Sequence, residues 1–199
     1  MKRVTLFDYG AGNLHSLGKA LAETGYEVRI ETDPRRATET DLLVLPGVGA
    51  FQLAAERLAP AREEVRTALA DGLPTIGICL GMQLLFDESE EGKGRGLGVI
   101  PGRVERIRSP RVPHIGWNSV EPSGEKAFAR AGLDVAYYAH SFVCRPEDES
   151  VVTAWTTEAE DRFPAAVRAG NVAGVQFHPE KSSREGVTFL AEMVREALR

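Results

Sequence analysis

The sequence has little of what marks several other classes of protein. It contains two cysteines in 199 residues, Cys79 and Cys144, too few for a disulfide framework, and both are expected to be free thiols. No apolar run approaches the length of a membrane span. The apolar stretch 4–7 ends at Asp8 and is too short for a signal peptide. We therefore expect a cytoplasmic protein without membrane association.

Basic charge is also not in excess, because 24 Lys and Arg stand against 29 Asp and Glu, a net charge of −5. Nucleic acid binding needs a clustered basic face, so nucleic acid is not expected as a partner. Asparagine and glutamine number three each, and arginine far outnumbers lysine. A thermophilic source and a GC-rich genome explain this bias equally well.

Apolar runs and amphipathic segments alternate over the first half of the chain. We predict strands at 3–7, 26–30, 42–45 and 75–79, and helices from about residue 14, at 60–70 and at 80–86. Strands that alternate with helices imply βαβ units and a parallel sheet covered on both faces.

After Gly92 the pattern changes to short strands, predicted at 99–107, 114–120, 135–138, 151–156, 165–169 and 172–177. Gly170-Asn171 is typical of a hairpin turn between the last two. A closing amphipathic helix is predicted at 184–198. No linker divides the chain, so we expect one α/β domain over residues 1–199, with an open, mostly parallel sheet flanked by helices and added antiparallel strands.

A cysteine between two glycines stands where a strand is predicted to meet a helix, in Gly77-Ile78-Cys79-Leu80-Gly81. This is the G-x-nucleophile-x-G elbow, in which glycines avoid collisions with the neighbouring strand and helix. The helix N-terminus favours a thiolate, and the N–H of Leu80 is placed to be an oxyanion donor. Alone, the pattern fits a buried structural cysteine equally well.

A candidate base follows in His178-Pro179-Glu180. Residues i and i+2 of an extended segment lie on one face, and Pro179 disfavours a helical His178. Glu180 can then accept the Nδ1–H of His178, leaving Nε2 for the thiol. Cys79 and His178 both end predicted strands, where parallel sheets place functional groups. We predict a Cys79–His178–Glu180 triad for attack on a carbonyl carbon, in preference to a surface His–Glu pair.

Segments along nearly the whole chain resemble the class I (triad) glutamine amidotransferases, and in finer detail the glutaminase subunits of imidazole glycerol phosphate synthases. They lie, in order, at 7–13, 46–51, 77–83, 113–118, 138–142 and 178–182. The resemblance implies a flavodoxin-like three-layer fold and hydrolysis of glutamine. It also implies a heterodimer with a cyclase subunit, which receives the ammonia to make imidazole glycerol phosphate and an aminoimidazole carboxamide ribonucleotide.

The resemblance further implies which residues serve the site. Those implied for glutamine binding are Gly47, Gly49, Leu80, Gln83, Glu91, His140, Ser141 and Phe142. Leu80 and Gly49 are implied as oxyanion donors, although a plain strand-to-helix turn explains the loop at 46–51 as well. Glu91 lies in an acidic run that a solvated surface also explains. Residues implied to face the partner are Asn13, Trp117, Tyr138 and Lys181.

No cofactor or metal is expected. Gly10-Ala11-Gly12 follows a strand, but His15 occupies the third glycine position of a dinucleotide fingerprint. The other histidines show no metal-ligand spacing with Cys144 or with each other. Competing interpretations are the glutaminase subunit of anthranilate, guanylate or pyridoxal phosphate synthesis, and a non-catalytic redox sensor or binding module of the same fold.

An uncoupled glutaminase would waste glutamine, which suggests a means of control. Glycine accepts either sign of φ. We therefore hypothesise that the Val48–Gly49 peptide turns its N–H towards the oxyanion only when the loaded partner is bound.

Overall fold

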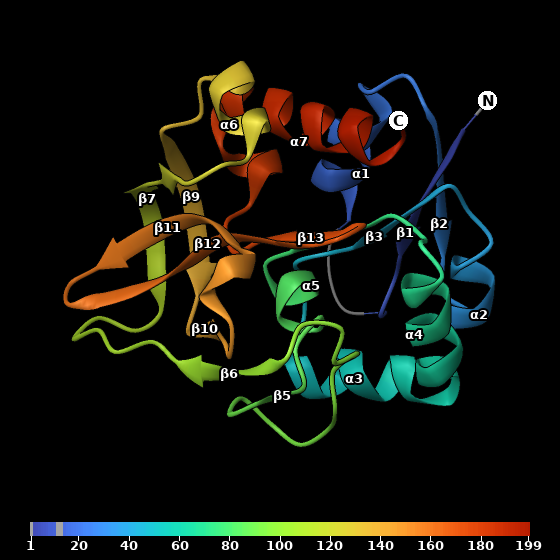
Figure 1. The fold of residues 1–199 in the computed structure, drawn as a ribbon, viewed down its shortest axis with the longest axis horizontal. Coiled ribbons are helices and arrows are strands. Elements are labelled where there is room, and N and C mark those ends of the chain that lie inside the picture. Colours follow the sequence, from blue (N-terminus) through green and yellow to red (C-terminus); the bar gives the residue numbers. More distant parts are fainter. Residues whose placement is uncertain (1, 11–13) are drawn as a thin grey trace.

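The computed structural model describes residues 2–10 and 14–199. They form one large central sheet with helices packed around it (Figure 1). Eight strands follow the order β2-β1-β3-β4-β13-β12-β11-β8. The first five are parallel: β2 (Glu27–Glu31), β1 (Arg3–Phe7), β3 (Leu42–Leu45), β4 (Thr75–Ile78) and β13 (Val172–Val175). With β13 in fifth place, this is the flavodoxin-type order 2-1-3-4-5. The predicted α/β fold with a mostly parallel sheet is confirmed.

The predicted antiparallel addition extends the sheet beyond β13. It consists of β12 (Asp161–Ala169), β11 (Val152–Glu158) and β8 (Glu121–Pro122). The β12–β13 hairpin turns at Gly170 and Asn171, as predicted, and Gly170 has a φ of 58°. Two small sheets stand beside the large one: β10 (Phe142–Pro146) with β6 (Gly102–Arg106) and β5 (Glu88–Ser89), and β7 (His114–Ser119) with β9 (Val135–His140).

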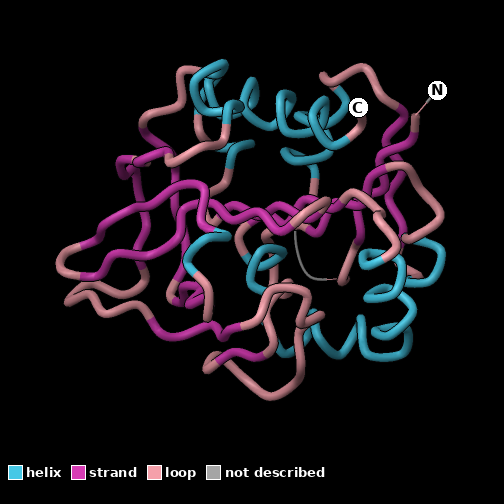
Figure 2. Tube along the Cα trace, viewed as in Figure 1, coloured by secondary structure: helices cyan, strands magenta, loops and turns pink. Residues whose placement is uncertain are grey.

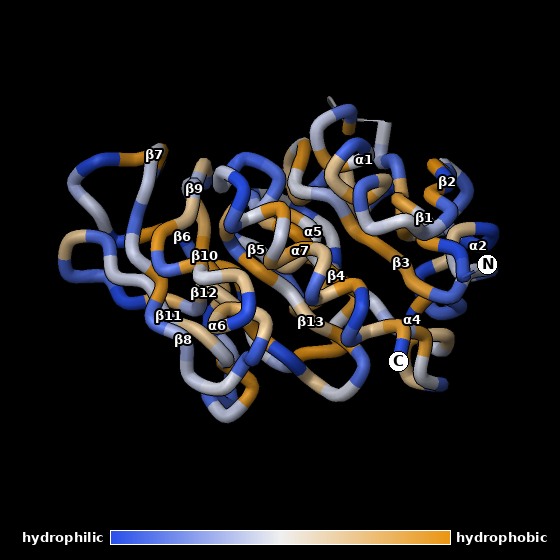
Figure 3. The backbone as a smooth tube through the Cα atoms, turned by 90° about the horizontal axis from the view of Figure 1, so that it is seen from above, coloured by the Kyte–Doolittle hydropathy of each residue, from blue (hydrophilic) through white to orange (hydrophobic). Residues whose placement is uncertain are grey.

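Helices cover both faces of the large sheet and complete three layers (Figures 1 and 2). One face carries α1 (His15–Ala22), α6 (Lys126–Ala131) and α7 (Ser183–Ala197). The other carries α2 (Pro34–Ala37), α3 (Phe51–Leu58), η1 (Ala59–Ala61), α4 (Arg62–Ala70) and α5 (Leu80–Gln83). Each face has its own hydrophobic cluster, so every residue of β3 and β4 is buried. This explains the continuous apolar runs that predicted these strands, coloured mainly as hydrophobic in Figure 3.

The helix after Cys79 is shorter than the predicted 80–86, because it ends at Gln83. Beyond it, the carbonyl groups of residues 84–86 accept hydrogen bonds from the loop at 97–99 instead of from another helical turn. The structure also adds α3, α6 and β10, where we predicted no element, and the one-turn helices η2 (Glu149–Val151) and η3 (Pro179–Lys181).

The longest helix over the described residues is α7, with 15 residues. None of the helices in this part of the chain is both long and apolar enough to cross a membrane. The assignment of residues 1–199 to a single domain stays a prediction.

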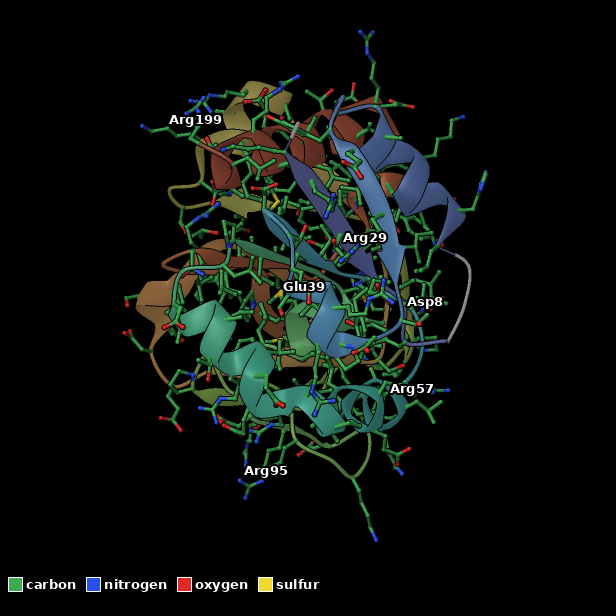
Figure 4. All side chains as sticks on the ribbon, turned by 90° about the vertical axis from the view of Figure 1, so that its right-hand side faces the viewer. Asp8, Arg29, Glu39, Arg57, Arg95 and Arg199 are labelled. Carbon is green, nitrogen blue, oxygen red and sulfur yellow. The ribbon has the colours of Figure 1, made fainter. Side chains whose placement is uncertain are left out.

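The outer strands of the large sheet are charged or short. At one edge β2 alternates charged and apolar residues, and its Arg29 is labelled on this side of the molecule in Figure 4. The guanidinium of Arg29 donates to the carbonyl oxygen of Arg36 at 2.6 Å. At the other edge β8 has only Glu121 and Pro122, both paired with β11.

Candidate active site

Cys79 lies at the carboxyl end of β4 and immediately before α5, in a strained turn. Its φ of 48° and ψ of −105° are unusual for a residue with a side chain. A β-carbon added to Gly81 would lie 2.0 Å from the carbonyl oxygen of Leu45, and one on Gly77 would lie 2.5 Å from that of Gly81. Both distances are too short for any side chain, so the steric reason for the two glycines is confirmed.

His178 and Glu180 form the predicted pair. His178 Nδ1 lies 2.9 Å from Glu180 Oε1, and both side chains are buried. His178 is extended, with a φ of −102°, but Glu180 lies in the one-turn helix η3 and not in a continuing strand. The contact that we derived from an extended segment is therefore made across a turn that begins at Pro179.

The nucleophile and the imidazole meet over Gly47. A β-carbon on Gly47 would lie 2.8 Å from Cys79 Cβ and 2.9 Å from His178 Cε1. The structure thus brings together the three predicted catalytic residues, with the absent side chain of Gly47 leaving room for them. Their catalytic roles stay predictions.

The charge of His178 depends on its two neighbours. Burial would lower the pKa of His178, but Cys79 and then Glu180 outweigh burial and raise it from 6.5 to about 10. At neutral pH the ring is therefore an imidazolium. A protonated ring is what the predicted first role of His178, protonation of the departing ammonia, requires.

Histidine NMR can test this charge state. At pH 7.5 we expect the ¹⁵N shifts of His178 to report a doubly protonated ring, and Cys79→Ala to lower the pKa of His178. Because the folded-state pKa exceeds the unfolded value, this proton stabilises the fold fully below about pH 6.5, and the stabilisation is lost as pH rises through about 10. A neutral His178 ring at pH 7.5 in the wild-type chain would contradict the raised pKa of His178.

Hydrogen bonds to β9 fix the backbone of His178. Its N–H donates to the carbonyl oxygen of Tyr137 at 2.9 Å. The buried hydroxyl of Ser182 donates to the carbonyl oxygen of His178 at 2.7 Å and accepts from the N–H of Tyr137 at 2.9 Å. The position of the imidazole is therefore tied to β9.

Gln176 is a further residue at the nucleophile and was not among those predicted for the site. Its side chain is completely buried, and its Nε2 lies 3.5 Å from Cys79 Sγ. Its Oε1 accepts from Gln83 Nε2 at 3.3 Å. The available signal was an amide between Val175 and Phe177, because a polar side chain in a buried apolar run needs hydrogen-bond partners.

A cavity of about 300 Å³ opens beside Cys79. It is lined by Cys79 and by all eight residues predicted to bind glutamine, namely Gly47, Gly49, Leu80, Gln83, Glu91, His140, Ser141 and Phe142. Pro113, Ile115 and Ala139 line it as well and were not predicted. The structure brings the predicted set together, while the binding of glutamine by these residues stays a prediction.

Two lining residues have features that bear on their predicted roles. Gly49 has a φ of 100°, which favours glycine, and Leu80 is the first residue of α5. Glu91 accepts the N–H of Phe51 at 2.9 Å through Oε2, at the N-terminus of α3. Glu91 is exposed, but this contact fixes it at the cavity, in contrast to a merely solvated acidic residue.

His140 is held in a buried chain of hydrogen bonds. Its Nδ1 lies 3.0 Å from the carbonyl oxygen of Phe142, which can only accept, so Nδ1 carries the proton. Its Nε2 lies 3.1 Å from His114 Nδ1. Burial, followed by the charge of His114, lowers the pKa of His140 to about 3. His140 is therefore a neutral cavity residue of fixed tautomer.

The residues predicted to face a partner have different positions. Trp117 is 55% exposed on β7, and Lys181 is exposed at the end of η3. Asn13 lies outside the described residues. Tyr138 is completely buried, with its hydroxyl 2.5 Å from Thr156 Oγ1. Because side chains alternate along β9, its neighbour Tyr137 lies on the other face, beside Trp117. Tyr138 is therefore not on the exposed face of β9 in this chain, and its contact with a partner stays a prediction.

A second hollow, of about 380 Å³, lies at the opposite end of the strands, beside Arg66 and Asn171. Its lining has neither cysteine nor histidine. Among the described residues, the predicted nucleophile, base and binding residues lie together at one place, the cavity beside Cys79. That cavity is the candidate active site.

Comparisons with known proteins agree with this geometry. The family model described as "Glutamine amidotransferase class-I" matches residues 5–196. The chain is 45% identical over 202 residues to "Imidazole glycerol phosphate synthase subunit HisH" of Natronomonas pharaonis, covering 96% of this chain and 93% of that protein. It is 42% identical over 198 residues to the protein of the same name from Sulfolobus acidocaldarius, covering 97% and 98%.

Solved structures show the same fold. A "glutamine amidotransferase" crystal structure superposes with a TM-score of 0.75 at 22% identity, covering 98% of each chain. A chain of "PurLQS from Thermotoga maritima" gives a TM-score of 0.74 at 21% identity, covering 98% of this chain and 99% of that one.

Proposed function

The chain belongs to the class-I glutamine amidotransferase family, and on that basis we propose that it is the glutaminase subunit of an imidazole glycerol phosphate synthase. Relatives that carry this synthase's name at 42% and 45% identity over nearly the whole chain support it. They favour the histidine pathway over anthranilate, guanylate or pyridoxal phosphate synthesis. The lyase reaction of the synthase belongs to the cyclase partner.

The observation that carries the enzymatic assignment is the Cys79–His178–Glu180 arrangement beside the cavity. Glu180 Oε1 lies 2.9 Å from His178 Nδ1, so Nε2 is left for the reaction. A pair held in this way favours catalysis over a redox sensor or binding module. Together with the family, it supports hydrolysis of glutamine to glutamate and ammonia.

In the first half of the reaction the Cys79 thiolate attacks the side-chain amide carbon of glutamine. The carbonyl becomes an oxyanion, with the N–H groups of Leu80 and Gly49 as its proposed donors. The C–N bond then breaks as His178 gives its Nε2 proton to the leaving nitrogen. The products of this half are a thioester and ammonia.

In the second half His178, now neutral, takes a proton from water as the water oxygen attacks the thioester carbon. The C–S bond breaks, its electron pair returns to Cys79, and glutamate leaves. His178 remains protonated, so the thiolate–imidazolium pair is restored. The ammonia passes to the cyclase subunit.

The cyclase subunit is proposed to dock on the outer face of β7 and β9. Ile115 is 62% exposed, Trp117 55% and Val135 48%, and all three project from these two strands. Ile115 also lines the cavity at Cys79. A partner on this face would therefore lie beside the cavity at which ammonia is released. A cytoplasmic location is part of the proposal, supported by two free cysteines.

A glutaminase assay with and without the cyclase subunit tests the function. In the complex, with the cyclase's nucleotide-like substrate bound, we expect glutamate release at least about tenfold faster than from the isolated chain, because a misdirected oxyanion donor typically costs about 10²–10³ in rate. Absence of glutamate release in any complex would remove the proposed function. Equal rates of glutamate release by the isolated chain and by the complex would contradict only the hypothesis that the partner controls the N–H of Gly49.

A further inference from the structure

We propose that Gln176 is a further catalytic residue, whose carboxamide N–H stabilises the thiolate form of Cys79. The inference rests on the proposed function, because it assigns a role at the same nucleophile. It begins from the 3.5 Å contact between Gln176 Nε2 and Cys79 Sγ.

The orientation of the Gln176 amide follows from its neighbours. The carbonyl oxygen of Phe142 can only accept, so the Gln83 atom 2.9 Å away from it is the nitrogen. The same nitrogen lies 3.3 Å from Gln176 Oε1, which must then be the oxygen. The remaining end of the Gln176 amide, its NH₂ group, therefore faces the sulfur.

The backbone presents Gln176 and His178 to the same atom. The N–H of Cys79 donates to the carbonyl oxygen of Val175 at 2.7 Å, and the N–H of Gln176 donates to that of Ala165 at 2.9 Å. Gln176 and His178 both contact the nucleophile, whereas Phe177 between them is buried in the hydrophobic cluster with Phe128 and Phe189. One short segment thus delivers both a neutral donor and a charged base to Cys79.

A discrete donor at this position has a clear electrostatic purpose. The helix after Cys79 is a single turn, Leu80–Gln83, so its dipole is small. Cys79 is buried, and a buried anion needs hydrogen bonds to replace those from water. Hydrogen bonds to a charged acceptor are about twice as strong as neutral ones, so Gln176 favours thiolate over thiol. The same bond assists the second half-reaction, in which the C–S electron pair returns to sulfur.

The titratable groups around Cys79 come from several elements. His178 faces it directly with Glu180 behind, Cys144 of β10 interacts with its charge, and His140 of β9 interacts with His178. Each of these is unchanged in a Gln176 variant. A change in Cys79 reactivity would therefore report the lost or altered donor.

Alkylation of Cys79 by iodoacetamide, followed by mass spectrometry of the full-length chain from pH 5 to 10, tests the role without any glutaminase assay. Gln176→Met removes the donor at similar side-chain length. We expect the midpoint of its rate profile to rise by about one pH unit, a roughly tenfold loss of thiolate at low pH, with an unchanged rate at high pH. Gln176→Glu keeps an acceptor for Gln83 and places a carboxylate at the sulfur, so its midpoint should rise further.

Thr156→Val is the matched control, because it also removes a completely buried polar group. The Thr156 hydroxyl is hydrogen-bonded to the hydroxyl of Tyr138 and to the carbonyl oxygen of Ser119, and not to the sulfur. Thr156→Val should lower the melting temperature and leave the profile unchanged. Unshifted profiles in folded Gln176→Met and Gln176→Glu, or an equal shift in Thr156→Val, would overturn the role of Gln176. If the proposed function itself fails, wild-type complexes release no glutamate while these profiles can still differ.

Discussion

Cys79→Ala should abolish glutamine hydrolysis, with a loss of at least about 10⁴-fold in the complex, because the atom that attacks the amide carbon is removed. The measurement is glutamate release by the purified complex with the cyclase subunit, with ammonia production measured in parallel. The complex itself should still form, since Cys79 is 95% buried and its sulfur faces the cavity. Cyclase activity with added ammonia should likewise survive.

Cys144→Ala is the matched control for this result. Cys144 is also a free and buried thiol, on β10, and its pKa is raised by burial and then by the charge of Cys79. It is a neutral packing residue, so its truncation should cost about 1 kcal/mol of stability and leave turnover nearly unchanged. Hydrolysis that survives in Cys79→Ala would refute the triad, as would an equal loss in Cys144→Ala.

Gly47→Ala is expected to lower kcat/KM by about 10²-fold or more while the protein remains folded. The added methyl would lie 2.8 Å from Cys79 Cβ, 2.9 Å from His178 Cε1 and 2.9 Å from the carbonyl oxygen of Ile78. Nucleophile and imidazole must therefore separate, and a displacement of about 1 Å at reacting atoms can cost about 10²-fold. The ¹⁵N titration of His178 should show a lower pKa, because Cys79, which raises the pKa of His178, moves away.

Gly18→Ala provides the comparison for Gly47→Ala. Gly18 lies inside α1, and a β-carbon there would meet nothing within 4 Å. Alanine should stabilise α1 by roughly 0.5–1 kcal/mol and leave turnover as it is. Full activity in Gly47→Ala would mean that the loop relaxes without moving the catalytic pair, contrary to the steric argument.

The parts of the fold that were predictable are those in which burial alone selects the residues. β1 and β3 lie inside the sheet between two helical layers, so β3 is entirely apolar, β1 is mostly apolar, and the bounds of both were predicted correctly. α3 was missed, although Phe51, Ala54, Ala55 and Leu58 have helical spacing and form its buried face.

The arrangement of the three proposed catalytic residues was predictable, because the elbow and the His–Glu pair are each local in sequence and both follow predicted parallel strands. Cys79 lies in its own elbow, and His178 contacts a residue only two positions away. The contact of Gln176 with Cys79 joins residues 97 apart, and its meaning depends on the amide of Gln83 and the carbonyl of Phe142. A local sequence pattern does not predict how these side-chain amides are oriented. Tyr138 shows the same limit, since the face of β9 that is buried is decided by packing.

The charged and short edges of the large sheet bear on how this chain avoids aggregation. An exposed apolar surface such as the outer face of β7 and β9 becomes hazardous when a molecule also offers open strand edges for pairing. β8 has two residues, one of them a proline without an N–H to donate, and β2 carries charge at every second position. Strand addition from a second copy is therefore disfavoured at both ends. The chain can thus carry an exposed apolar face without strand pairing at these edges, and replacing Pro122 or the charges of β2 with β-branched residues should promote self-association.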